Sequence, residues 1–218
     1  MKFFIDTANL DEIKEAYALG ILDGVTTNPS LMAKEGIKGQ DNIIAHYKAI
    51  CDIVEDNVSA EVIATDFEGM IKEGENLASI SPKIVVKIPM IKDGIKAIKY
   101  LSGKGIRTNC TLIFSAGQAL LAAKAGATYV SPFIGRLDDI NQDGTELIAQ
   151  IVHIFDNYQL QTQVLAASVR HTMHLITCAE IGSHVATCPL KVITGLLNHP
   201  LTDSGLSKFL EDYKKSQS

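Results

Sequence analysis

The feature that most constrains the fold is a regular alternation of two kinds of segment. Short runs rich in β-branched and apolar residues occur eight times. Their starts lie roughly 20 to 35 residues apart, the spacing of a β-strand plus the helix that crosses over to the next strand. The predicted strands are Phe3–Asp6, Gly24–Asn28, Val58–Ala64, Ile84–Pro89, Arg107–Ile113, Tyr129–Phe133, Val164–Ser168 and His184–Cys188.

Amphipathic stretches with helical spacing separate these strands, among them Leu10–Leu19, Asp66–Ile80 and Ser115–Ala125. Several carry start or stop signals. Asp66 is a helix-capping residue type at the start of its stretch, and Gly126 and Gly182 stand where two stretches should end.

Eight such alternations without a linker predict an α/β protein, a single (β/α)8 TIM barrel that occupies residues 1–218. A doubly wound open sheet is the alternative, but it rarely uses eight strands in so short a chain, and no GxGxxG or GxxxxGK[ST] loop supports one. A last helical segment, Thr202–Lys215, lies beyond the eighth unit and is free to pack on a neighbouring subunit.

Composition excludes several classes of protein. A formal charge of −5 argues against a nucleic-acid or anionic-membrane surface, and no window approaches the roughly 18 apolar residues of a membrane span. The N-terminus turns acidic at Asp6, too early for a signal peptide. The four cysteines are scattered without a CxxC pair, which indicates reduced thiols in a cytoplasmic protein rather than a disulfide or zinc framework.

Polar residues occupy the positions where a barrel keeps its chemistry. Alternate strand residues point inward, and functional groups project from the carboxyl ends of the strands. Seven of the eight predicted strands supply an inward or strand-end polar group: Asp6, Asn28, Glu61 (with Ser59), Lys87, Asn109 and Thr111, Ser131 (with Phe133), and Ser168. An ordinary barrel interior would hold Val, Ile and Leu, so this constellation is the strongest functional signal in the sequence.

Lys87 is the candidate nucleophile because it lies in the apolar strand Ile84–Pro89, where a charge is costly to bury. A free lysine has a pKa of about 10.4, so very little of it is the neutral amine at pH 7. Lowering that pKa by about three units raises the nucleophilic fraction about a thousandfold, and desolvation by an apolar wall works in that direction. The alternative is a strand-end lysine whose head reaches solvent.

Asp6 and Glu61 are predicted to flank the lysine from the first and third strands. Covalent imine chemistry needs one group to move protons during carbinolamine formation and dehydration, and another to take a hydroxyl proton when a carbon–carbon bond breaks. Two carboxylates in separate environments suit these tasks. They would also raise the pKa of Lys87, and the sequence leaves open which influence wins.

The three arginines of the chain divide between the two ends of the barrel. Arg107 precedes the fifth strand and is expected at the far end. Arg136 and Arg170 follow the sixth and seventh strands, where two guanidinium forks and Ser168 would bind a phosphate dianion. His171 and His174 have metal-ligand spacing without an obvious third ligand, so we expect ordinary helix histidines, no metal and no cofactor.

At this point the chain resembles a known family, the transaldolases, and most closely the short bacterial subfamily that also contains fructose-6-phosphate aldolase. The resemblance spans essentially the whole chain. The segments that carry it are Asp6–Ala8, Gly24–Ser30, Val85–Pro89, Asn109–Ser115, Ser131–Arg136 and Ala167–Arg170.

The resemblance implies a class I (Schiff-base) transferase of the pentose phosphate pathway. It would move a dihydroxyacetone unit from sedoheptulose 7-phosphate to glyceraldehyde 3-phosphate through an imine on Lys87. The short transaldolases that this chain resembles form decamers of two five-membered rings, which implies a homo-oligomer here. By resemblance Asp6 handles the proton of the cleaved hydroxyl, while Glu61 and Thr111 hold the catalytic water. The implied substrate-binding residues are Asn28, Asn109 and Ser131 around the dihydroxyacetone unit, and Arg136, Ser168 and Arg170 around the phosphate.

Two positions distinguish the activities within this subfamily. Its aldolase members resemble this chain but carry Gln in place of Glu61 and Tyr in place of Phe133. Fructose-6-phosphate aldolase is therefore the alternative function, and both residues speak against it. A phosphate-binding barrel isomerase or decarboxylase, which would not use the lysine covalently, and a non-catalytic sugar-phosphate sensor are the more distant alternatives.

Overall fold

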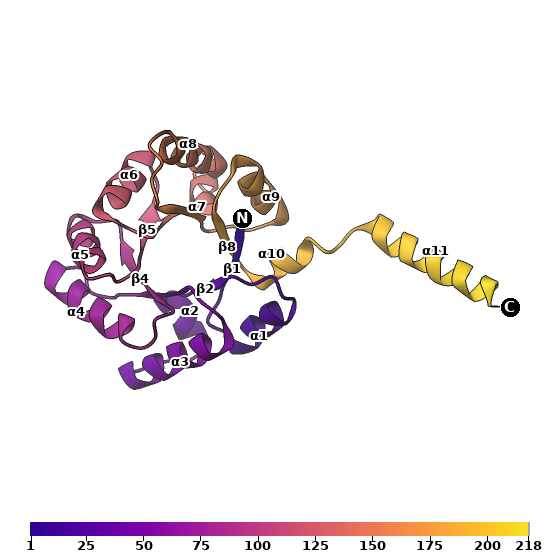
Figure 1. The fold of residues 1–218 in the computed structure, drawn as a ribbon, viewed down its shortest axis with the longest axis horizontal. Coiled ribbons are helices and arrows are strands. Elements are labelled where there is room, and N and C mark those ends of the chain that lie inside the picture. Colours follow the sequence, from indigo (N-terminus) through magenta and orange to yellow (C-terminus); the bar gives the residue numbers. More distant parts are fainter. Residues whose placement is uncertain (218) are drawn as a thin grey trace.

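The computed structural model describes residues 1–217 and shows a closed barrel of eight parallel strands. Each strand pairs with its neighbours in the sequence, and β1 closes the ring against β8. In Figure 1 the helices surround this barrel on the outside. The prediction of a (β/α)8 barrel is therefore confirmed, and the open doubly wound sheet is excluded.

The strands begin within one residue of the predicted positions, and four end earlier than predicted. Their bounds are β1 Lys2–Asp6, β2 Gly24–Thr26, β3 Val58–Glu61, β4 Ile84–Pro89, β5 Thr108–Ile113, β6 Tyr129–Pro132, β7 Gln163–Ala166 and β8 Val185–Cys188. The early ends matter for function. Asn28, Phe133 and Ser168 therefore lie in the loops that follow β2, β6 and β7 rather than in the strands.

Helices follow every strand, some in pairs. Their bounds are α1 Leu10–Ala18, α2 Pro29–Lys34, α3 Gln40–Ile53, α4 Phe67–Ala78, α5 Lys92–Gly103, α6 Ala116–Ala125, α7 Ile134–Asp138, α8 Gly144–Asn157, α9 Thr172–Ile181, α10 Leu190–Gly195 and α11 Pro200–Ser216. The predicted signals act as expected. Asp66 caps α4 by accepting a hydrogen bond from the Gly69 N–H, and Gly126 and Gly182 end α6 and α9 with left-handed φ angles of 98° and 87°.

Two separate apolar layers hold the barrel together. The larger lies between strands and helices and includes Ile5, Val86, Ile88 and Cys110. The smaller fills the barrel interior and consists of Phe4, Val85, Tyr129, Leu165, Ala167 and Val185, with Phe133 packed against it. Strand residues alternate between the layers, as the pleat requires.

The amino-terminal end of the barrel is closed by a polar network. Arg107 donates to both carboxylate oxygens of Asp56, at 2.6 and 2.9 Å, and to the Pro82 carbonyl oxygen at 2.8 Å. Asn57 Oδ1 accepts from Arg107 and, at 2.8 Å, from the hydroxyl of the buried Tyr129. Arg107 therefore lies at the end of the barrel predicted for it.

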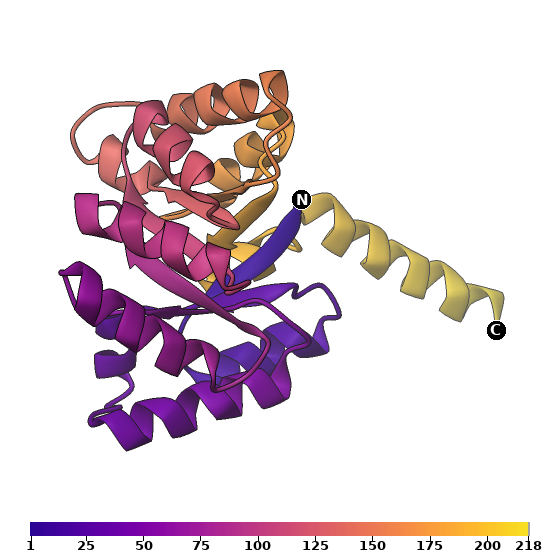
Figure 2. The same ribbon diagram turned by 60° about the vertical axis from the view of Figure 1, so that its left-hand side comes forward.

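Helix α11 does not belong to either apolar layer. Figures 1 and 2 show it projecting away from the barrel beyond α10. It has no buried residue, and Leu206, Phe209 and Leu210 are all exposed. In the described part of the chain, no helix has the length and apolar character needed to cross a membrane.

Candidate active site

Lys87 is buried inside the barrel near the carboxyl end of β4. Only 6% of its surface is exposed, although its side chain ends in an amine. The Nζ atom donates to the backbone carbonyl oxygen of Thr27 at 3.1 Å and lies 3.1 Å from Glu61 Oε2. The amine therefore does not reach bulk solvent, and the alternative of a solvated strand-end lysine does not apply.

Strand register brings Glu61 to the lysine. β3 and β4 pair in parallel with Glu61 opposite Lys87, so the two side chains extend from adjacent strand positions. Thr27 reaches the same amine from the other side, because it follows the last residue of the short strand β2. A buried ammonium is stable only when a charge and hydrogen-bond acceptors compensate its lost hydration, and these two contacts supply them.

Asp6, at the end of β1, is the second carboxylate of the site. Its Oδ1 accepts from the Thr26 hydroxyl at 2.7 Å, and the Thr187 hydroxyl lies 2.6 Å from that of Thr26. Burial raises the pKa of Asp6 above its ordinary value, while the charge of Lys87 and the Thr26 hydrogen bond oppose part of this rise. The two carboxylates thus occupy different environments, as predicted: one is ion-paired with the lysine, and the other is hydrogen-bonded to a hydroxyl.

A cavity of about 180 Å³ opens above these groups at the carboxyl end of the barrel. Eight of the predicted site residues line it: Asp6, Asn28, Lys87, Thr111, Ser131, Phe133, Arg136 and Ser168. Thr26, Ala167 and Thr187 complete the lining and were not predicted. Strand alternation would have predicted two of them. Thr26 has the same parity as Asn28, and Thr187 has the same parity as the inward-facing Val185.

Asn109 of β5 does not line the cavity, and its side chain links β6 to β3 across the barrel interior. Its Oδ1 accepts from the Ser131 hydroxyl at 2.8 Å, and its amide donates to Ser59 Oγ at 3.2 Å. Thr111, two residues further along β5, is 1% exposed, and its hydroxyl has no protein hydrogen-bond partner. This hydroxyl is free to bind water or substrate inside the cavity.

Asn28 combines a structural contact with a place in the cavity. It caps α2, and its Oδ1 accepts from the Leu31 N–H at 3.0 Å. The cap fixes the side-chain orientation and uses the oxygen, which leaves the amide N–H groups as the donors available to a ligand.

Ser168 reaches the cavity through an unusual backbone rather than through strand alternation. β7 ends at Ala166. Leu165 and the next residue but one, Ala167, both lie in the barrel interior, so a continued strand would turn Ser168 outward. Ser168 has a φ of 57°, a left-handed conformation that redirects its side chain into the lining. The predicted strand end at Ser168 was wrong, but the residue itself lies at the site.

The two arginines predicted to bind phosphate occupy different positions. The Arg136 guanidinium lies 5.0 Å from the centre of the Phe133 ring and lines the cavity. Arg170 does not line the cavity, because its two terminal nitrogens are paired with both oxygens of Asp139, one of them at 2.6 Å. Hydrogen bonding with Arg170 lowers the pKa of Asp139. Asp139 was missed because a loop carboxylate gives no sequence signal.

The histidines have structural contacts. The His171 side chain caps α9 by accepting from the His174 N–H, and His174 lies 3.1 Å from Asp138. Within residues 1–217, no three His, Cys, Asp or Glu side chains are grouped so that they could hold a metal ion. Cys51, Cys110, Cys178 and Cys188 are all buried free thiols.

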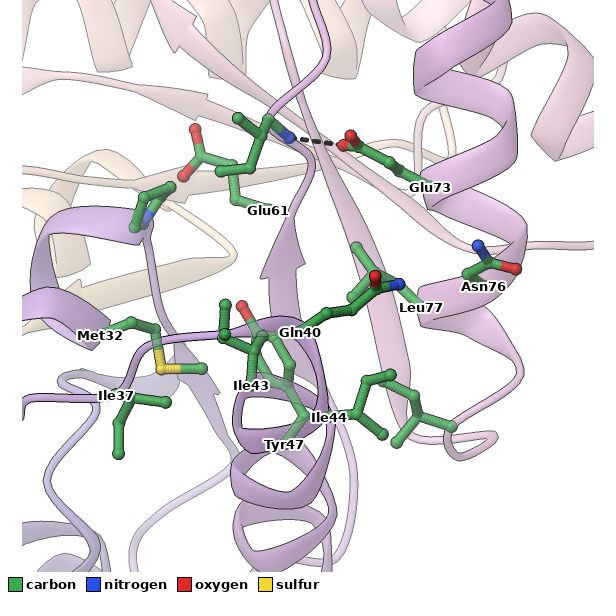
Figure 3. Close-up of a pocket in the computed structure, with 14 residues that line it drawn as sticks. Met32, Ile37, Gln40, Ile43, Ile44, Tyr47, Glu61, Glu73, Asn76 and Leu77 are labelled. Carbon is green, nitrogen blue, oxygen red and sulfur yellow. Dashed lines mark hydrogen bonds between the residues drawn. The ribbon is translucent and has the colours of Figure 1, made fainter.

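A second cavity, of about 370 Å³, lies between α2, α3 and α4 on the outer side of Glu61. Figure 3 shows that its walls are mainly apolar and include Met32, Ile43 and Leu77. Glu73 of α4 accepts from the Ile63 N–H at 2.7 Å, the dashed line in Figure 3, and so fixes the chain that follows β3.

Comparison with known proteins identifies the family of the chain. Residues 3–218 match the model of the family described as transaldolase/fructose-6-phosphate aldolase. The chain belongs to this family. A relative from Cytophaga hutchinsonii named probable transaldolase is 81% identical, and one of the same name from Phocaeicola vulgatus is 73% identical. Both alignments cover 99% of each chain.

Membership of the family supports a transferase of the transaldolase class, so the resemblance drawn from the sequence is confirmed at that level. A solved structure from Coccidioides immitis, described as a fructose-1,6-biphosphate aldolase, superposes with a TM-score of 0.57 at 13% identity. It covers 86% of this chain and 73% of its own. At that identity the likeness concerns the barrel fold alone.

The raised pKa of Asp6 predicts a stability change of definite sign. A raised pKa means that the folded state binds the proton more tightly than the unfolded state, so the ionised carboxylate destabilises the fold at higher pH. Asp6→Asn should therefore raise the melting temperature near pH 7. The gain should shrink as the pH falls through the raised pKa toward about 3.9, the unfolded value, where both states are protonated.

Asp56→Asn is the control of opposite sign, to be measured by calorimetry across the same pH series. Partial burial raises the pKa of Asp56, but the Arg107 hydrogen bonds and charge outweigh this and lower it overall. That variant should melt at a lower temperature near pH 7. An Asp6→Asn gain that increases on acidification would show that burial is not the dominant influence on Asp6.

Proposed function

We propose that this protein is a class I transaldolase that transfers a dihydroxyacetone unit from sedoheptulose 7-phosphate to glyceraldehyde 3-phosphate through an imine on Lys87. The observation that carries the proposal is the buried Lys87 amine, in contact with Glu61 and at the base of a cavity that Asp6 also lines. A lysine at this depth with two acid–base groups beside it is suited to covalent catalysis.

The proposed chemistry begins with addition of the Lys87 amine to the ketone carbon of the donor. Loss of water gives the imine, and Glu61 with the free hydroxyl of Thr111 holds the water that leaves and later returns. Asp6 then accepts the proton of the hydroxyl on the carbon beyond the scissile bond. The carbon–carbon bond breaks and an aldehyde departs. The electron pair of the broken bond stays with the dihydroxyacetone fragment, which remains attached to Lys87 as an enamine.

Reversal of these steps on a second aldehyde completes the transfer. The enamine attacks the acceptor carbonyl, Asp6 returns its proton to the new hydroxyl, and water releases the ketose. The raised pKa of Asp6 supports this assignment, because a carboxyl poised closer to neutrality exchanges a proton more readily in both directions. Asn28, Asn109 and Ser131 would hold the dihydroxyacetone unit through the whole cycle.

Transfer rather than simple cleavage is favoured by Phe133 in the cavity wall. A phenol at this position could protonate the enamine and release free dihydroxyacetone, as in the related aldolases. Phe133 has no proton to donate, and its ring contacts Phe114 and Arg136. The enamine would therefore survive until an acceptor aldehyde arrives, which distinguishes the proposal from fructose-6-phosphate aldolase.

Arg136, Ser168 and Arg170 are proposed to bind the substrate phosphate. Arg136 and Ser168 line the cavity. Arg170 lies beside them, and its guanidinium group is paired with the carboxylate of Asp139. Because this ion pair is exposed, a phosphate dianion can take the place of Asp139.

We further propose that α11 packs on a neighbouring subunit in a decamer. Its apolar residues have no partner within the described chain and would otherwise face water. A cytoplasmic location stays a prediction that rests on the free thiols.

Substitution of Lys87 tests the imine directly. Lys87→Met should abolish turnover and also the adduct formed with fructose 6-phosphate and borohydride, because the apolar side chain has similar bulk but no amine. Peptide mass mapping of the wild-type adduct should place it on Lys87. An adduct on Lys83 or Lys92 that persists in the variant would refute the assignment.

Substitution of Arg136 and Arg170 tests phosphate recognition. Arg136→Ala and Arg170→Ala should each weaken binding of phosphorylated substrates about 10- to 150-fold, the usual effect of losing one charge-assisted contact, and should affect unphosphorylated analogues little. Arg170→Lys should recover only part of the loss, because an ammonium lacks the bidentate fork.

Arg107→Ala is the control for the phosphate prediction. Arg107 lies at the other end of the barrel and is held by Asp56, so its loss should lower the melting temperature without changing the preference for phosphate. A phosphate preference that depends on Arg107 and not on Arg136 or Arg170 would contradict the assignment.

Light scattering tests the assembly. The wild-type protein should show about ten times the chain mass of 23.6 kDa at micromolar concentration. Phe209→Asp combined with Leu210→Asp should dissociate it, because charges would replace two exposed apolar residues of α11. A wild-type mass near that of one chain would refute the proposal.

A further inference from the structure

The two groups that contact the Lys87 amine both lead to one buried side chain, Tyr47 of α3. Tyr47 is 3% exposed, and its hydroxyl lies 2.9 Å from Thr27 Oγ1. Thr27 Oγ1 donates its own proton to the Ser59 carbonyl oxygen at 3.0 Å. Because a threonine hydroxyl has one proton, the phenol must be the donor toward Thr27.

The same phenol also lies near the backbone of Glu61, which counteracts part of the pKa rise caused by burial of the phenol. β2 pairs with β3 only as far as Thr26 opposite Ser59, so the β3 residues beyond Ser59 have no strand partner on that side. Tyr47 and Glu61 both line the outer cavity there.

Figure 3 shows two of these residues from the outer cavity, with Glu61 above and Tyr47 below on α3. The carbonyl oxygen of Thr27 and the carboxylate of Glu61 each lie 3.1 Å from Lys87 Nζ. Thr27 and Glu61 have a further neighbour besides Lys87. The phenol of Tyr47 holds the Thr27 side chain and lies near the Glu61 backbone, and it comes from a helix outside the barrel.

We propose that Tyr47 is a positioning residue for Lys87: its phenol locks Thr27 and Glu61 in the places from which they hold the reactive amine. This inference rests on the proposed imine chemistry for its effect on turnover. Burial raises the pKa of Tyr47, so the phenol keeps its proton and remains a donor to Thr27 across the range in which the enzyme would work.

A purely structural role for Tyr47 makes a different prediction, and the chain contains a matched residue for the comparison. Tyr129 is 2% exposed, and its hydroxyl donates to Asn57 Oδ1 at 2.8 Å at the amino-terminal end of the barrel. Tyr47→Phe and Tyr129→Phe therefore each remove one hydrogen-bonded phenol hydroxyl from an equally buried site. Both should lower the melting temperature.

Turnover is the first measurement. Tyr47→Phe should lower kcat about 10- to 100-fold, the effect expected when reacting groups are held less accurately, and KM for the phosphorylated acceptor should change little. Tyr129→Phe should leave kcat near the wild-type value. Thr27→Val, which removes the hydroxyl between Tyr47 and Ser59 but keeps the shape, should lower kcat in the same direction and serves if Tyr47→Phe does not fold.

The second measurement requires no substrate. Trace acetylation with acetic anhydride, followed by peptide mass mapping, gives the reactivity of Lys87 relative to the exposed Lys124 of α6. When Thr27 and Glu61 are less firmly held, they stabilise the ammonium form less, so Tyr47→Phe should raise the relative labelling of Lys87 several-fold at constant pH. Tyr129→Phe should not.

The proposal is overturned if the two phenylalanine variants behave alike in both measurements. Failure of the imine mechanism is recognised separately, because wild-type protein would then give no borohydride adduct on Lys87. The labelling comparison would still decide whether Tyr47 controls the environment of the amine.

Discussion

The interaction on which the site depends is the enclosure of one ammonium group by a barrel of apolar strands. Lys87 stands between Val86 and Ile88, which pack into the outer apolar layer, and its own side chain turns inward. Without partners this charge would be too costly to bury. The partners come from the two preceding strands: Glu61 at the end of β3 and the carbonyl oxygen of Thr27 just beyond β2. The charge is therefore stabilised only after three strands have paired in register.

The same enclosure gives the two carboxylates different properties. Glu61 pairs with the ammonium, whereas Asp6 is buried beside hydroxyl groups and its pKa is raised. The Thr26 hydroxyl donates to Asp6, so the single proton of the adjacent Thr187 hydroxyl must be directed to Thr26. Residues from β1, β2 and β8 thus form one chain of hydrogen bonds at the closure of the barrel. Closure of the ring and placement of the proton-transfer group are parts of the same structure.

The sequence contains most of this site because strands obey a simple alternation. Lys87, Glu61 and Asn109 were predicted from parity, and they lie on the inward face. Ser168 shows where the rule fails. It reaches the cavity through a left-handed residue after an early strand end, which alternation cannot describe. Tyr47 could not be predicted at all, because one apolar-looking tyrosine in an amphipathic helix does not indicate which strand ends its hydroxyl will meet.

Asp139 illustrates a further limit of sequence analysis, since its contact depends on the folding of two loops against each other. Gly135 makes that approach possible: a Cβ atom there would collide with the Arg170 side chain and the Ser168 carbonyl oxygen. The glycine lets Arg170 cross α7 and reach Asp139, while Arg136 of the same turn reaches Phe133. Both loops therefore present their cations on one side of the cavity.

The division of polar groups between the two ends of the barrel separates stability from function. At the amino-terminal end, Arg107, Asp56, Asn57 and Tyr129 bond to one another and leave little for a ligand. At the carboxyl end, the Thr111 hydroxyl has no partner and Arg170 is held only by an exposed carboxylate. An unpaired buried hydroxyl is costly for a fold, and at Thr111 a bound substrate can supply the missing partner.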